Sequence, residues 1–115
     1  MLNIELRGVV KSFEQDQEKT DVNSWVVWRR LVLHDLDQDV DIPEWFYIVA
    51  CSQEYLVENP NKFSETERRQ VVVQKTFNEA ALEESAVQRF NALSFSNWDE
   101  FYRKMPEVFI HEDGH

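Results

Sequence analysis

Two apolar runs, residues 25–33 and 44–51, constrain the fold of this chain more than any other feature. The first run is rich in Val, Trp and Leu, and strands favour β-branched and aromatic residues. Alternate side chains of a strand point to opposite faces, and both faces of this run are largely apolar. We therefore predict a central strand here. The second run, EWFYIVAC, predicts another dense apolar strand, and the two runs together suggest a hairpin with a long polar loop.

Three further segments have strand character. Residues 2–10 alternate apolar and polar side chains, which is the spacing of a strand with one buried face, and Gly8 predicts a bulge near its end. Residues 69–77, RQVVVQKTF, predict a third central strand. A short edge strand is expected at residues 107–110.

Three polar residues are predicted helix N-caps: Ser52, Asn78 and Ser96. The first of these helices is short and stops at Asn59-Pro60, because the residue before a proline is disfavoured in a helix. The second helix covers residues 79–93. The third begins at Ser96, where Ser96-x-x-Asp99 is similar to a capping box, and Pro106 ends it.

The order of these elements predicts the fold class. Strands and helices do not alternate regularly, so we expect an α+β fold with an antiparallel sheet of about four to five strands and two to three helices packed mainly on one face. The chain has 115 residues, of which 43% are hydrophobic, enough for one packed core. A single domain, residues 1–115, is expected, with a frayed tail at residues 111–115.

The charge balance excludes several classes of partner. The chain has 22 acidic and 12 basic residues, for a formal net charge of -10. Binding to nucleic acid phosphates and to anionic membranes depends on Lys and Arg, so neither is expected. The N-terminus lacks the pattern of a signal peptide and no apolar stretch approaches ~20 residues, so we expect a cytoplasmic protein. A basic protein is the natural partner of such a chain.

An acidic segment between the two apolar runs, His34-Asp-Leu-Asp-Gln-Asp-Val-Asp41, has an aspartate at every second position and no Lys or Arg. A calcium loop of the EF-hand type is not expected, because Val40 stands where the glycine is needed and Phe46 where the bidentate glutamate is needed. Two interpretations remain open, a solvated turn and an acidic docking surface. The neighbouring aspartates are expected to raise the pKa of His34.

The sequence gives little support for an enzyme. Carboxylate pairs are unavoidable among so many acids, and no G-x-S-x-G or phosphate-binding glycine loop is present. The lone Cys51 is interpreted as a small core residue, and His111 and His115 are too weak a motif to predict a metal. No catalytic residue, metal or cofactor is predicted.

The four tryptophans are mostly expected in the core. Trp25 and Trp28 fall on opposite faces of one strand, so we expect one of the two to be exposed where helices do not cover the sheet. An exposed tryptophan beside acids is typical of a binding hot spot.

Four segments resemble one known family: residues 45–52 (WFYIVACS), residues 54–56, the strand expected from Arg69 to Val73, and the final helix containing Trp98. Their order, spread over residues 25–105, is similar to that of the immunity protein 8 family of bacterial polymorphic-toxin systems. The resemblance implies a small cytoplasmic antitoxin that binds the C-terminal toxin domain of a cognate effector, as immunity proteins of contact-dependent growth inhibition systems do.

A mechanism without chemistry follows, in which the chain occludes a basic nuclease toxin as a monomer or weak dimer. Acidic side chains would replace the substrate phosphates and an aromatic residue would anchor the centre. The expected partner-binding residues are Asp35, Asp37, Asp39, Asp41, Glu44, Glu14, Asp16, Glu18, Trp28 and Trp45. The alternatives are an acidic adaptor or chaperone for a secreted effector and, third, a hydrolase whose carboxylates meet only in the fold.

Overall fold

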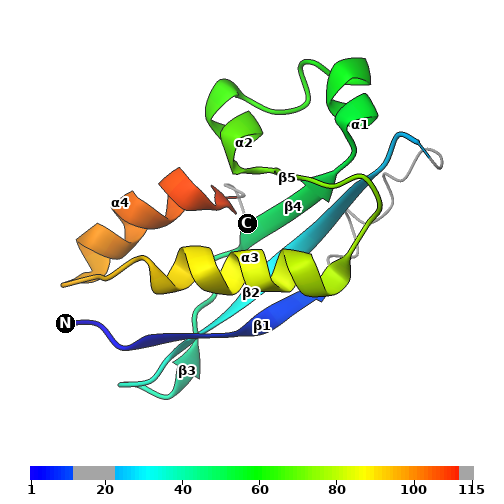
Figure 1. Ribbon diagram of the computed structural model, residues 1–115. Helices are drawn as coiled ribbons and strands as arrows, with labels where there is room; N and C mark the ends of the chain where they lie inside the picture. Colours follow the sequence, from blue (N-terminus) through cyan, green and yellow to red (C-terminus); the bar gives the residue numbers. More distant parts are fainter. Residues whose placement is uncertain (12–22, 112–115) are drawn as a thin grey trace.

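The computed structural model describes residues 1–11 and 23–111 of the chain. Within them it has the predicted α+β fold, with a six-stranded sheet and four helices (Figure 1). The strands are β1 (Ile4–Lys11), β2 (Val26–Asp35), β3 (Val40–Asp41), β4 (Phe46–Cys51), β5 (Val72–Val73) and β6 (Ile110–His111). The helices are α1 (Gln53–Glu58), α2 (Glu65–Gln70), α3 (Glu79–Asn91) and α4 (Trp98–Val108).

Strand β2 is central, as its two apolar faces predict. It pairs antiparallel with β1 on one side and β4 on the other, and the short β3 pairs with its C-terminal end. Strand β6 also pairs antiparallel with β4, whereas β5 pairs with it in parallel. The predicted bulge is confirmed, since the β1–β2 register shifts between Leu6 and Gly8 and Gly8 has φ 151°.

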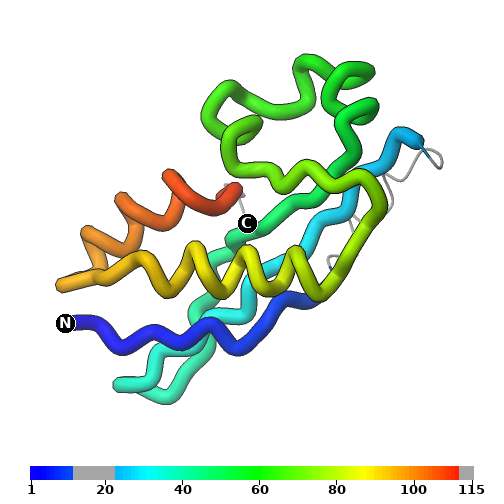
Figure 2. Tube along the Cα trace, viewed as in Figure 1, coloured from blue at the N-terminus to red at the C-terminus, as the bar shows by residue number. Residues whose placement is uncertain are grey.

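The two longer helices lie along one face of the sheet, as Figure 2 also shows. Phe46 and Ile48 of β4 pack there with Leu82 of α3 and Phe101 of α4, in a buried cluster that also contains Trp25, the residue before β2. Burying large apolar side chains of this kind contributes roughly 1.5–3 kcal/mol each. The helices are therefore held to the sheet mainly by this layer.

A second buried cluster covers part of the opposite face. Trp28 of β2 and Tyr47 of β4 pack there against Tyr55 of α1, Phe63 and Val71. Trp25 and Trp28 are each 6% exposed. The expectation that one of them would be exposed is wrong, because the segment from α1 to α2 covers the face that the longer helices leave open.

Residues 69–77 do not form the predicted central strand. A capping box between Ser64 and Glu67 starts α2 upstream, the helix continues to Gln70, and only Val72–Val73 pair with β4. Satisfying the first backbone N–H groups stabilises a helix start, so local capping overrides the strand preference of the three valines.

Two other boundaries differ from the prediction. The cap of α4 is Asn97, whose side chain accepts from the backbone N–H of Glu100, whereas the Ser96 N–H donates to the Glu100 carboxylate. Pro106 lies inside α4 instead of ending it. The sequence predicts a frayed tail from residue 111, but His111 pairs with Phe46 of β4 in the sheet. Residues 112–115 lie outside the described part of the chain.

Candidate functional site

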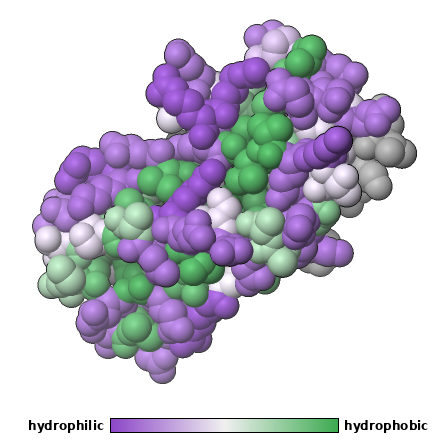
Figure 3. Space-filling model, viewed as in Figure 1, coloured by the Kyte–Doolittle hydropathy of each residue, from purple (hydrophilic) through white to green (hydrophobic). Residues whose placement is uncertain are grey.

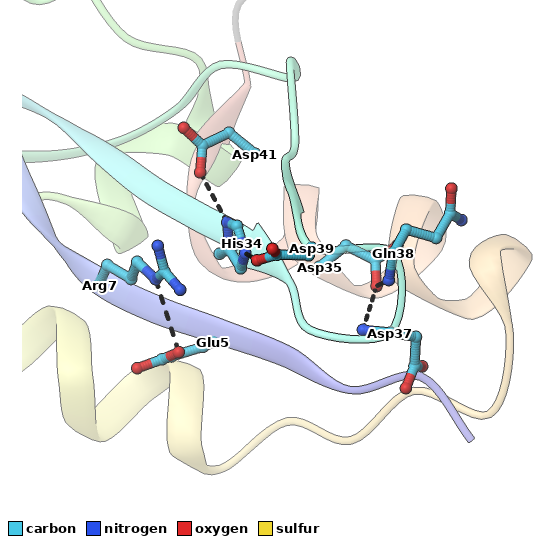
Figure 4. Close-up of polar contacts among 8 residues, drawn as sticks. All are labelled: Glu5, Arg7, His34, Asp35, Asp37, Gln38, Asp39 and Asp41. Atoms are coloured by element: carbon cyan, nitrogen blue, oxygen red, sulfur yellow. Dashed lines mark hydrogen bonds and ion pairs between the residues drawn. The ribbon is translucent and has the colours of Figure 1, made fainter.

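The imidazole of His34 is clamped between two aspartates of the acidic segment (Figure 4). Its Nδ1 lies 2.8 Å from Asp41 Oδ1 and its Nε2 lies 2.9 Å from Asp39 Oδ1. The strand register explains the first contact, because His34 of β2 stands directly opposite Asp41 of β3 and such pairs share a face. Both ring nitrogens face acceptors, which favours the doubly protonated ring.

These contacts raise the pKa of His34, with the Asp41 hydrogen bond as the largest cause and the Asp39 hydrogen bond next. Desolvation and the positive charge of Arg7 on β1 act in the opposite direction. The predicted direction of the shift is therefore confirmed. Protonated His34 offsets part of the negative charge of the acidic segment. The segment is therefore a loop held by side-chain contacts and not a set of four independent carboxylates.

Asp35 has a structural role that its place in the alternating pattern does not suggest. It is 5% exposed, and its Oδ1 accepts hydrogen bonds from the backbone N–H groups of Asp37 and Gln38. This side chain closes the turn locally, as aspartates commonly do. Because the carboxylate is used inside the turn, we infer that Asp35 shapes the loop more than it displays charge.

The other three aspartates face solvent. Asp39 and Asp41 have side chains that are 90% and 72% exposed despite their contact with His34. Asp37 is exposed and accepts a hydrogen bond of 3.0 Å from the side chain of Asn3. Asp39 also has φ 53°, a left-handed conformation that aspartate tolerates better than most residues. The hairpin thus presents three carboxylates in fixed positions.

A groove lies between this hairpin and helix α4. Its cavity volume is about 360 Å³, and its walls include Asp35, Val40, Asp41 and Ile42 from the hairpin and Trp98 and Tyr102 from the helix. We call it the hairpin–α4 groove. Val40 is 51% and Tyr102 46% exposed, and none of the residues that line the groove is basic.

Glu44 connects the hairpin to the same helix. Its Oε1 accepts a hydrogen bond of 3.4 Å from the hydroxyl of Tyr102, and its Oε2 lies 3.5 Å from His111 Nε2. Burial, and then the negative charge of Glu44, raise the pKa of Tyr102. Glu44 therefore adds negative charge next to the groove, although it does not line it.

The remaining predicted binding residues are placed elsewhere or lie outside the described part. Trp28 is buried and packs edge-on against Tyr47, so it presents no aromatic surface to a partner. Trp45 is half-buried, with the Arg30 guanidinium 5.7 Å from its ring centroid. Glu14, Asp16 and Glu18 lie in residues 12–22, outside the described residues.

Trp98 and Tyr102 are the aromatic residues that sequence reasoning missed. The helical spacing i, i+3, i+4, i+7 assigns Trp98, Phe101, Tyr102 and Met105 to the core. Of these four residues, Phe101 and Met105 are fully buried. Trp98 is only half-buried and Tyr102 is exposed. The charged residues around Tyr102 in the sequence are the one signal that it lies at the edge of the apolar stripe.

The described residues contain neither a reactive thiol nor a metal-binding cluster. Cys51 is fully buried, and burial raises the pKa of its thiol to about 11. Over residues 1–11 and 23–111, no group of three or more His, Cys, Asp or Glu side chains is arranged to hold a metal ion. In the same ranges, no helix combines the length and apolar character needed to cross a bilayer.

Comparisons with protein-family models, with curated proteins and with solved structures find no match to this chain.

Proposed function

We propose that this chain is an immunity protein that binds the toxin domain of a cognate secreted effector and blocks it by occupying its surface. The supporting observation is the anchored acidic hairpin, whose exposed carboxylates belong to Asp37, Asp39 and Asp41. Nuclease toxins must bind polyanions, so their clefts are basic, and a rigid set of carboxylates complements such a cleft.

The anchoring matters for the proposed role. Besides the His34 clamp, the backbone N–H of Leu36 donates to Asn3 O over 2.9 Å, and the N–H of Ile42 donates to Leu33 O over 2.9 Å. A loop held in this way loses little conformational entropy when it binds a partner. The hairpin carries its charges at the end of the molecule away from α1 and α2 (Figure 1), where a large partner has access.

In this mechanism the chain performs no chemistry. Its carboxylates take the places of substrate phosphates against the Lys and Arg side chains of the toxin. Binding also excludes water from the neighbouring hairpin–α4 groove. Attraction between the acidic chain and a basic partner raises the association rate toward 10⁸–10⁹ M⁻¹s⁻¹ at low salt, roughly the upper limit for steered association. Rapid capture limits the number of toxin turnovers before inhibition.

The test starts from the gene directly upstream: where it encodes a large secreted protein, the C-terminal domain of that protein is purified and its toxic activity is titrated with this chain. We expect toxin activity to fall linearly and to end at about one equivalent of the protein, as tight binding requires. Activity that persists at excess protein while the two proteins still form a complex would favour the alternative, an acidic adaptor or chaperone that escorts the effector without inhibiting it. The absence of any complex would contradict both.

A further inference from the structure

The hairpin–α4 groove combines apolar and aromatic side chains, and the acidic Glu44 lies beside it. Val40 and Ile42 line it on the hairpin side and Trp98 and Tyr102 on the helix side, with Asp35 and Asp41 also in its walls. Figure 3 shows hydrophobic surface enclosed by hydrophilic residues at the end of the molecule where the hairpin lies. Leu36, which is 51% exposed, belongs to the same hairpin but does not line the groove.

We propose that the hairpin–α4 groove receives an arginine or lysine side chain of the protein partner. The proposal rests on the proposed function for the identity of that partner, but the groove makes its own chemical demand. A long basic side chain has an apolar stem that suits Val40 and Ile42 and a cationic head that the Glu44 carboxylate beside the groove attracts. Cations also bind to the faces of Trp and Tyr rings.

The arrangement of the aromatic rings supports this occupant. Trp98 packs edge-on against Phe101 with ring centroids 5.3 Å apart, which fixes it against the helix. Tyr102 is tilted against Trp98 with centroids 6.1 Å apart, and its hydroxyl donates to Glu44. The rings are thus held in place by contacts outside the groove, so binding a side chain requires little rearrangement.

The charge of the groove selects against other occupants. The Glu44 carboxylate, which accepts from Tyr102 beside the groove and is 34% exposed, loses solvation if an apolar segment covers it. A guanidinium or ammonium group replaces the lost water with charge-assisted hydrogen bonds. The volume of about 360 Å³ is at the lower end of the range for small-ligand sites, roughly 300–1,000 Å³, and suits a single side chain.

The test uses blocked amino acids as probes, so it does not need the toxin. The protein is titrated with N-acetyl-argininamide, N-acetyl-lysinamide, the uncharged analogue N-acetyl-citrullinamide and N-acetyl-phenylalaninamide, while the Trp98 indole and Val40 methyl NMR signals are followed. We expect saturable shifts of these signals with at least one basic probe, at a Kd of about millimolar as for a single side chain. The citrulline probe should bind about tenfold more weakly or not at all.

Two variants and a matched control locate the binding. Val40→Lys places a cation in the groove wall and Tyr102→Ala removes a ring, and each should weaken binding of the basic probe about tenfold or more. Val57→Lys makes the same change at a 69% exposed position of α1 and should leave the affinity unchanged. Circular dichroism and thermal unfolding establish that all three variants are folded.

Several outcomes overturn the proposal. These are shifts that are equal for arginine and citrulline, stronger binding of phenylalanine, or no response of the groove signals to either basic probe. Concentration-dependent broadening of the same signals without any probe would assign the groove to a second copy of the chain and would also overturn it. Because stoichiometric toxin inhibition is measured separately, failure of the groove proposal and failure of the proposed function can be told apart.

Discussion

The Nδ1 atom of His34 lies 2.8 Å from Oδ1 of Asp41, and this contact ties the central strand β2 to the return strand of the acidic hairpin. Asp39 Oδ1 contacts the other ring nitrogen. The positive charge of Arg7 on β1 acts to lower the pKa of the ring, and Glu5 of β1 stands opposite His34 in the strand register. The shape of the hairpin therefore depends on an imidazole whose pKa is raised in the folded chain.

The first prediction is a pH-dependent contribution of His34 to stability. Its pKa is raised in the folded chain, so its contribution is fully present below the unfolded value of about 6.5 and is lost as the pH rises through the folded pKa. The free energy of unfolding of His34→Gln should therefore differ from wild type more at about pH 5.5 than at about pH 9. Urea unfolding at both pH values measures this, and a difference that grows with pH would contradict it.

The second prediction concerns Asp35, which is buried in the turn. Asp35→Ala leaves the backbone N–H groups of Asp37 and Gln38 without their acceptor, so we expect a loss of about 1–3 kcal/mol in the free energy of unfolding. Asp37→Ala removes an exposed acid from the same hairpin and should change stability by less than about 0.5 kcal/mol. Equal effects of the two substitutions in urea unfolding would show that Asp35 does not close the turn.

The third prediction concerns the buried Arg29 of β2. Its Nε lies 3.0 Å from both carboxylate oxygens of Glu79 at the start of α3. Glu79→Gln should destabilise the chain by about 1–2 kcal/mol, less than a fully buried pair because Glu79 is half exposed. Glu83→Gln, which removes an exposed charge one turn later in α3, is the control and should have little effect on the thermal midpoint.

The fourth prediction is that Cys51 is unreactive in the folded chain. With its pKa raised to about 11 and its side chain fully buried, the thiolate that reacts is scarce and inaccessible at neutral pH. Iodoacetamide should modify Cys51 only through unfolding, and the rate should rise steeply in urea. Rapid alkylation of the folded protein would contradict the burial of this residue.

Much of the sheet was predictable because its signals are local. The apolar runs that became β2 and β4 are dense on both faces, Ser52 and Asn78 are the observed caps of α1 and α3, and Gly8 marks the bulge. The strand predicted at residues 69–77 was wrong, although the Ser64-x-x-Glu67 capping box that starts α2 is visible in the sequence. The capping box and the strand preference of the three valines are competing local signals, and the outcome can be predicted only when both are considered.

The candidate site was less predictable because it depends on packing between distant segments. The alternating aspartates suggest four equivalent acids, but the turn uses Asp35 and the histidine clamp uses Asp39 and Asp41. No local pattern shows that Tyr102 faces the hairpin, because the two segments meet only in the folded chain. The roles of Asp37, Asp39 and Asp41 in binding a partner stay a prediction.

The most direct test of the central claim is the salt dependence of the association rate with the toxin domain. In Asp37→Asn/Asp39→Asn/Asp41→Asn the rate at low salt should fall about tenfold or more and its salt dependence should weaken, because these carboxylates face solvent. Glu54→Gln/Glu58→Gln/Glu107→Gln removes the same number of charges elsewhere and should retain most of the wild-type rate. Equal rates for the two triple variants at every salt concentration would contradict the claim that the acidic hairpin meets the partner.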